Sequence, residues 1–136
     1  VTAQGLNLEG AYLGPVLTIR SELGIACYIN LDLSNMNLTG TNFSKCDVKG
    51  VLFENTNISG CDFLDCKNLD PKQLAFTIGA ETALFNKAPD KNFAFKKQIK
   101  IYSETLDPVA YYAPPSQKVG NKIIAFLAKL TNIFDD

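Results

Sequence analysis

The sequence contains no histidine and no tryptophan. Without histidine the chain cannot build a Ser-His-Asp triad or a Cys-His pair, and it lacks the commonest general base and metal ligand. A glycine-rich loop of the phosphate-binding kind is also missing. Carboxylate pairs such as Asp62 and Asp65 remain as candidate acid and base groups. Both residues belong to the sequence repeat described below, which by itself predicts acidic residues at such outward positions. We therefore expect a protein that is not an enzyme and that needs no cofactor.

Long hydrophobic runs are missing as well, although 46% of the 136 residues are hydrophobic. The first residues do not show a charged segment followed by an apolar one, so neither a membrane span nor a signal peptide is predicted. The length and composition fit one compact soluble domain or a small core with an appendage. We expect a cytoplasmic protein, with secretion as an effector left open.

Charge is unevenly distributed, although the net charge is only -1. Residues 1–66 carry seven acids and three bases, which gives a net charge of -4. Residues 67–136 carry ten lysines and seven acids, which gives a net charge of +3. An acidic first half and a basic second half affect the choice of partner and say nothing about the fold.

A sequence motif in the first half of the chain recurs after twenty residues, and we call this recurrence the echo. Residues 37–43 read NLTGTNF, and residues 57–63 read NISGCDF. Within the echo a large apolar residue stands at every fifth position, which we call the centre place. The centre residues are Leu33, Leu38, Phe43, Val48, Phe53, Ile58 and Phe63. Two positions before each centre is the inner place, which holds mostly small or apolar residues suited to a narrow core.

The period of five determines the kind of fold. It fits neither the 3.6 residues of a helical turn nor the two-residue period of a strand, so neither element places all centre residues on one face. If each pentad is a short extended piece followed by a corner, four pentads make one coil and residue n lies over residue n+20. Coils are then separated by the spacing of neighbouring strands, about 4.8 Å. The sequence predicts a buried ladder of centre residues, with Phe43 stacked on Phe63.

The stretch LDLSN MNLTG TNFSK CDVKG VLFEN TNISG CDF resembles the pentapeptide repeat family, whose consensus is roughly A(D/N)LXX. The Asp/Asn place, directly before the centre, holds Asp32, Asn37, Asn42, Asp47, Asn57 and Asp62, whereas Leu52 departs from it. The resemblance covers residues 31–66 and implies a mainly β fold, the right-handed quadrilateral β-helix. LNLEG AYLGP, at residues 6–15, gives two more pentads, and we place the β-helix domain over residues 1–68.

Residues 16–30, VLTIRSELGIACYIN, leave two alternatives open. Fifteen is a multiple of five, so degenerate repeats with centres at Thr18, Leu23 and Tyr28 continue the register, and periodicity favours this interpretation. A helical or loop insertion after Pro15 is the alternative.

Residues 69–79 are predicted to close the solenoid, because an open end exposes its apolar cross-section. LDPKQLAFTIG has Asp70 as a helix N-cap, Pro71 at the first helical position, Gln73 to complete a capping box and Gly79 as the stop. It also resembles the Leu-Thr-x-Glu-Gln-Leu segment that often ends pentapeptide helices. We expect Leu74, Ala75 and Ile78 to cover the last coil, and the repeats to stop near Asn68.

Residues 80–136 are predicted to form a C-terminal extension. NFAFKKQIKIY alternates apolar and polar residues, which indicates a short strand near 93–101. Residues near 117–134 have helical apolar spacing and predict an amphipathic helix. Its apolar residues are Val119, Ile123, Phe126, Leu127, Leu130, Ile133 and Phe134, with Lys118, Lys122 and Lys129 on the flanks. The helix packs on the solenoid, on 93–101 or on its copy in a homodimer; docking to a membrane surface is the alternative.

The cysteines raise the question of a metal site. Cys46, Cys61 and Cys66 all fall on inner places, which explains them without metal, and no CxxC pair exists. We expect no metal site and reduced thiols, with Cys27 the most reactive of the four if the register continues.

The resemblance implies a function in binding rather than in catalysis. We expect a noncatalytic interaction scaffold or adaptor with a protein partner and no direct contact with nucleic acid. Related proteins occur among secreted bacterial effectors. The alternative is DNA mimicry, since some family members bind type II topoisomerases through a strongly acidic rod. Leu52 and Leu64 are apolar at outward places, so they are the candidate contacts for a partner or for the C-terminal segment.

Overall fold

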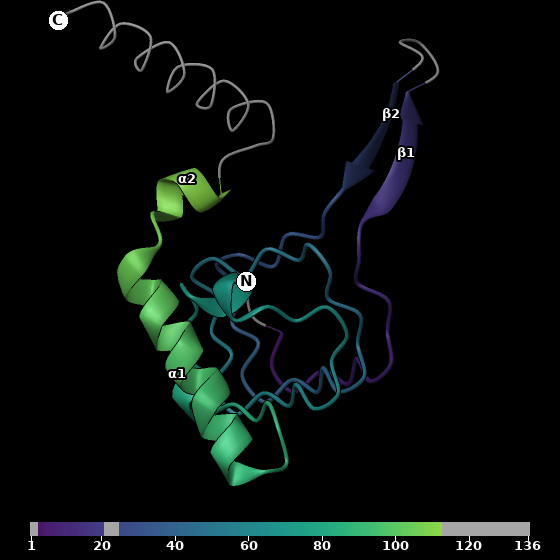
Figure 1. Ribbon diagram of the computed structural model, residues 1–136. Coiled ribbons are helices and arrows are strands. Elements are labelled where there is room, and N and C mark those ends of the chain that lie inside the picture. Colours follow the sequence, from purple (N-terminus) through teal and green to yellow (C-terminus); the bar gives the residue numbers. More distant parts are fainter. Residues whose placement is uncertain (1–2, 21–24, 113–136) are drawn as a thin grey trace, which may run out of the picture. The chain divides into compact units, whose positions relative to one another are not determined.

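The computed structural model describes residues 3–20 and 25–112, with side chains outside 18–28 and 112 (Figure 1). The chain divides into two units, Val1–Leu106 and Asp107–Asp136. The first unit contains the repeats, the strands β1 (Val16–Arg20) and β2 (Ile25–Ile29), two short 3-10 helices, η1 (Pro71–Leu74) and η2 (Ala80–Thr82), and the helix α1 (Pro89–Thr105). The described part of the second unit contains α2 (Pro108–Tyr112).

The repeats form a β-helix-type solenoid of stacked coils. Parallel bridges join residues that are twenty positions apart within the regular repeats, thirty-five apart across residues 16–30, and twenty-one or twenty-two apart at the closing segment. The bridges fall into four sets along the stack. We call the four sets of bridged residues the first to fourth ladders. They contain Asp32 and Leu52; Asn37, Asn57 and Ile78; Asn7, Asn42, Asp62 and Leu84; and Tyr12, Asp47 and Lys67, respectively. The bridged residues occupy the Asp/Asn place of each regular pentad.

Each pentad ends in a tight turn. In the pentad centred on Ile58, the amide of Cys61 donates to the carbonyl of Ile58 at 3.1 Å, and Gly60 between them has φ +65°. A positive φ at the third residue of a four-residue turn is the type II conformation, which favours glycine and asparagine. The Asp/Asn place has a reason too, because the Asn57 side chain accepts from the amide of Ser59 at 3.0 Å. Leu52 cannot make this bond.

The centre residues fill the interior of the solenoid. Six of the seven are buried, and Leu33 is half-buried. The rings of Phe43 and Phe63 are stacked, with centroids 4.9 Å apart and planes at 4°. The Phe53 ring contacts both edge-on. Burial of these rings removes a large apolar area from water and is the main stabilising contribution to the coils.

The paired strands β1 and β2 interrupt the coils between Pro15 and Leu31, so the expectation of degenerate repeats over 16–30 is wrong. We call this strand pair the hairpin insertion. Asn7 pairs with Asn42, thirty-five positions away, which is one coil of twenty plus fifteen inserted residues. β1 and β2 pair antiparallel, with Val16 opposite Ile29. The alternative of an insertion after Pro15 has the right place, but the inserted element is neither helix nor loop. Pro15 occupies a corner place, where the other pentads have a residue with positive φ. The proline ring fixes φ at about -65°, so Pro15 cannot adopt this left-handed conformation.

The segment after the last coil closes the solenoid in an irregular way. Asp70 and Gln73 form the capping box of η1, with Pro71 at its start. Gly79 does not stop this helix; it precedes η2 with φ +83°. Leu74 and Ala75 are buried, but Ile78 is 50% exposed, so its expected covering role is wrong. Bridges continue to Ile78 and Leu84, so pairing extends past Asn68.

α1 replaces the strand that was expected near 93–101. Phe95 and Ile99 face the solenoid, four residues apart as helical packing requires, while Phe93 is 68% exposed. The alternating pattern therefore reflects two faces of a helix. Pro89 suits its first turn, and the lysines, glutamine and alanine that follow favour a helix over a strand.

The expected amphipathic helix near 117–134, with its residues Val119 to Phe134, lies outside the described residues. Within the described part of the chain, no helix combines the length and the apolar character needed to cross a membrane.

Candidate interaction surface

The outward places of the coils form polar, weakly charged ladders. Asparagine side chains pair along them; the Asn55 amide donates to Asn35 at 3.0 Å, in the neighbouring coil. Asp47 accepts from Asn68 at 2.9 Å, and this bond, with the amide of Lys49, holds the pKa of Asp47 below its ordinary value. Lys67 lies next to Asp47 on the fourth ladder, where their backbones pair in a parallel β-bridge. None of the four described ladders presents an unbroken row of acids.

Leu52 and Leu64, the two apolar residues at outward places, differ in their surroundings. Leu64 lines a depression of about 400 Å³ together with Phe85, Lys87 and Phe95, so residues after the solenoid do lie beside it. Leu52 is half-buried on the first ladder, where it bridges to Asp32. The two leucines therefore belong to different environments, and their role as contacts for a partner stays a prediction.

The inner places hold hydrogen-bond donors that link successive coils. Cys61 donates its thiol to the carbonyl of Leu38 at 3.1 Å, and Cys66 donates to Phe43 at 2.9 Å. Thr56 makes the equivalent bond to Leu33 at 2.8 Å. The sequence explained these residues by size alone and missed this role. Cys46, Cys61 and Cys66 are free thiols, and the Cys27 side chain lies outside the described residues.

Burial makes these thiols poor nucleophiles. It raises the pKa of Cys61 to about 11 and that of Cys66 to about 12, from an ordinary 9.0. Burial also raises the pKa of Cys46. Because the thiolate is the reactive form, these thiols are inert near neutral pH.

The thiols make stability depend on alkaline pH. Between pH 9 and about 11, the unfolded thiols ionise while Cys61 and Cys66 stay protonated in the fold, so the free energy of unfolding should be constant up to about pH 8 and should fall above pH 9. Urea unfolding at pH 7 and pH 10 measures the difference. The double variant Cys61→Thr, Cys66→Thr keeps the donors and should show a smaller loss. An equal loss in both proteins would assign the dependence to other groups.

A row of aromatic rings continues from the coils into α1. Phe63 stacks on Phe85 with centroids 5.4 Å apart, and Phe85 stacks on Phe95 of α1 at 4.6 Å. The side chain of Asn92 accepts from the amide of Phe85 at 2.8 Å, which ties the first turns of the helix to the same segment. α1 is therefore an integral part of the closing structure.

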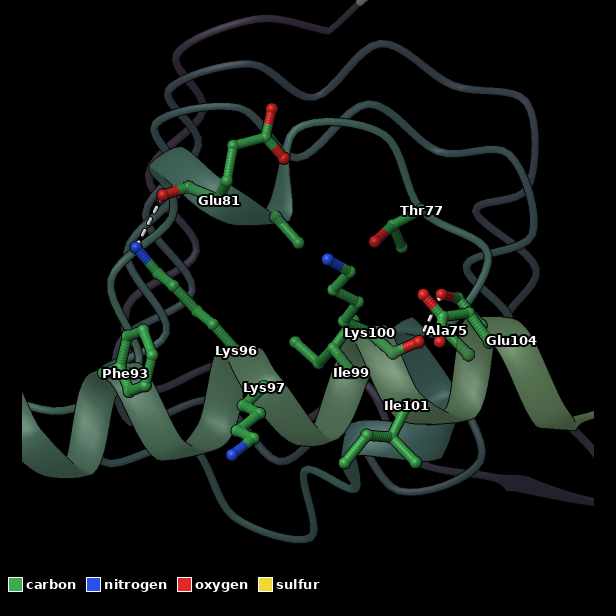
Figure 2. A pocket seen from close by; sticks show the side chains of 12 residues that line it. Ala75, Thr77, Glu81, Phe93, Lys96, Lys97, Ile99, Lys100, Ile101 and Glu104 are labelled. Carbon is green, nitrogen blue, oxygen red and sulfur yellow. Dashed lines mark hydrogen bonds between the residues drawn. The ribbon is translucent and has the colours of Figure 1, made fainter.

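A groove of about 830 Å³ lies between α1 and the segment 75–81, and we call it the cap groove. Its apolar lining includes Ala75, Ala80 and the buried Ile99. Figure 2 shows the Lys100 side chain directed from α1 toward Thr77, across the groove. Lys97 and Ile101, which also line the groove, point to the other side of the helix in this view.

The charged groups of the cap groove are mostly lysines. Lys96 donates to the carbonyl of Glu81 at 2.6 Å and so spans one part of the groove (Figure 2). The Lys100 carbonyl accepts from the Ser103 hydroxyl at 2.6 Å, but the Lys100 ammonium group makes no hydrogen bond or ion pair within the described residues. An apolar lining with an unpaired ammonium group can bind a ligand that is both apolar and anionic.

The sequence of the coils matches a known family of repeats. Residues 26–60 match the family model described as Pentapeptide repeats (8 copies). The chain carries pentapeptide repeats. This confirms the family that the sequence indicated, although the matched range begins within β2, and the pentapeptide coils themselves continue to the closing segment. No curated protein matches the chain.

Proposed function

We propose that this protein is a noncatalytic adaptor that binds a protein partner, built on a right-handed quadrilateral β-helix. Pentapeptide repeats are in general a noncatalytic fold used for protein interaction. Four bridged positions per twenty-residue coil support the quadrilateral form. The partner surface is the cap groove, because its concave lining is mostly apolar and holds the unpaired Lys100 ammonium group. Effector-type secretion from a bacterial cell is compatible with this role.

The charge pattern of the ladders is the observation that favours an adaptor over a DNA mimic. A mimic of duplex DNA needs a continuous negative face, because DNA presents one charge per about 1.7 Å of its axis. Here the second ladder, Asn37, Asn57 and Ile78, has no charge at all, and Asp47 of the fourth ladder lies beside Lys67. The mixed surface supports the adaptor. Binding to a type II topoisomerase remains the alternative function.

Capture on the immobilised full-length chain, with variants of each surface, tests the two functions. A partner protein that is captured by the wild type and by Lys49→Glu, but lost with Lys100→Glu, supports the adaptor. Both substitutions reverse one exposed lysine, and Lys49 lies on the coils rather than in the groove. Capture of a type II topoisomerase that is lost with Asp47→Asn and Asp62→Asn, and unaffected by Lys100→Glu, would establish the alternative. Capture that no groove variant affects would contradict the proposal.

A further inference from the structure

The second ladder ends in a backbone edge without a partner. At each lower rung, the carbonyl before the bridged residue accepts a hydrogen bond from the next coil, and the amide after it donates one. Thus Thr56 accepts from Ile78 at 2.8 Å, and Ile58 donates to Ile78 at 2.8 Å. At the last rung the equivalent groups are the carbonyl of Thr77 and the amide of Gly79. Neither has a hydrogen-bond partner within the described residues.

At two other ladders, one of the two edge groups is bound by a side chain of the closing structure. At the third ladder, the amide after Leu84 belongs to Phe85 and is bound by Asn92 of α1. At the first ladder, the carbonyl before Leu52 belongs to Val51 and accepts from the Gln73 side chain at 2.8 Å. The closing structure therefore binds one edge group at each of these ladders, whereas at the second ladder both edge groups lack a partner within the described residues. In the same part of the chain, the fourth ladder also ends in two unbound groups, the Cys66 carbonyl and the Asn68 amide, but these residues do not line the cap groove. Unpaired strand edges are sites where another chain adds by backbone pairing.

The open edge lies at the cap groove. Thr77 and Ala80, on either side of Gly79, both line it. Along the opposite wall stands α1, from which Lys100 reaches toward Thr77 (Figure 2). The groove therefore offers three features to one ligand: a backbone donor and acceptor, an apolar lining at Ala75 and Ile99, and an ammonium group without a partner.

The charges around the edge favour an acidic ligand. Three lysines and the two acids Glu81 and Glu104 line the groove. Lys96 is bonded to the Glu81 carbonyl, and Lys97 points to the other side of α1 (Figure 2). Lys100 therefore provides the ammonium group that an acidic side chain can meet. An extended peptide places alternate side chains on opposite sides, so acidic residues can face α1 while apolar residues face the lining. A basic peptide would meet the like charge of Lys100, which disfavours it.

We propose that the cap groove binds an extended acidic segment of the partner protein, which adds to the second ladder as one further parallel rung. The inference rests on the proposed adaptor function and names the chemistry that its partner supplies. A peptide amide donates to the Thr77 carbonyl, the Gly79 amide donates to a peptide carbonyl, and an acidic side chain pairs with Lys100.

The probe is an acetylated and amidated peptide of sequence Glu-Val-Glu-Val-Glu-Val, added to the isotope-labelled full chain and followed by amide chemical shifts. We expect the Gly79 amide to shift on titration, because it gains an acceptor. Lys100→Glu should weaken binding by about tenfold or more, since it removes an attractive charge and adds a repulsive one. Lys49→Glu should leave the affinity unchanged. A Lys-Val peptide of equal length should bind at least about tenfold more weakly.

Methylation of alternate peptide nitrogens separates strand addition from simple charge attraction. It removes backbone donors and keeps every side chain charge, so binding should be lost if the peptide pairs with the edge. Equal binding of the methylated peptide, or an unshifted Gly79 amide at saturation, would overturn the proposal. Failure of these peptides alongside groove-dependent partner capture would reject the acidic strand and keep the adaptor. Peptide binding without any captured partner would contradict the adaptor instead.

Discussion

Phe63→Ala should lower the free energy of unfolding by about 3–5 kcal/mol, the largest effect of any substitution considered for the coils. Phe63 stacks on Phe43 below and on Phe85 above, and it is 1% exposed. Alanine leaves a cavity between rigid coils whose backbone bonds prevent collapse. The loss therefore includes the transfer term and most of the cavity term. Urea unfolding followed by circular dichroism measures it.

Phe93→Ala is the matched control for this prediction. It removes the same atoms from a ring that is 68% exposed on α1, and it should change the free energy of unfolding by less than about 0.5 kcal/mol. Similar losses in the two variants would mean that the row of rings from Phe43 to Phe95 does not hold the coils together.

Gln73→Ala should cost about 2–4 kcal/mol, although it removes a polar residue. The Gln73 side chain is 6% exposed and donates to the carbonyls of Val48 and Val51 at 2.7 and 2.8 Å. It also accepts from the amide of Asp70 in the capping box. Alanine leaves the Val51 carbonyl buried without its donor and opens a space at the end of the solenoid.

Gln98→Ala provides the comparison, because Gln98 is exposed on α1 and alanine favours a helix. Its free energy of unfolding should stay within about 0.5 kcal/mol of the wild type. If Gln73→Ala is equally mild, water replaces the amide at the carbonyls, and the closing segment contributes less to stability than its hydrogen bonds indicate.

The coils were readable from the sequence because their constraints are local and repeated. A centre residue every five positions, an Asp/Asn before it and a glycine or asparagine at the corner each follow from one turn geometry. The centre residues from Leu38 to Phe63 are accordingly buried. The hairpin was missed because fifteen inserted residues preserve the count of five. Only Pro15 at a corner place, together with the β-branched and aromatic residues after it, signalled the interruption.

The closing structure could be predicted only in part. The capping box of Asp70 and Gln73 is a local signal, and the structure contains it. The role of α1 depends on Phe85, which no periodic pattern singles out, since it packs between Phe63 and Phe95 from distant segments. The cap groove was missed for the same reason. Its open edge is visible only after the bonds of every rung have been assigned.

The hairpin insertion makes one corner of the solenoid exchangeable. Its two ends lie opposite each other, at Val16 and Ile29, so the coil is entered and left at nearly one point. The last bridge before the insertion joins Tyr12 to Asp47, and pairing of the same two coils resumes at Asp32 and Leu52 after it. A segment of different length and character can thus occupy this corner without altering the stack, which allows the insertion to diversify in evolution independently of the core that supports it.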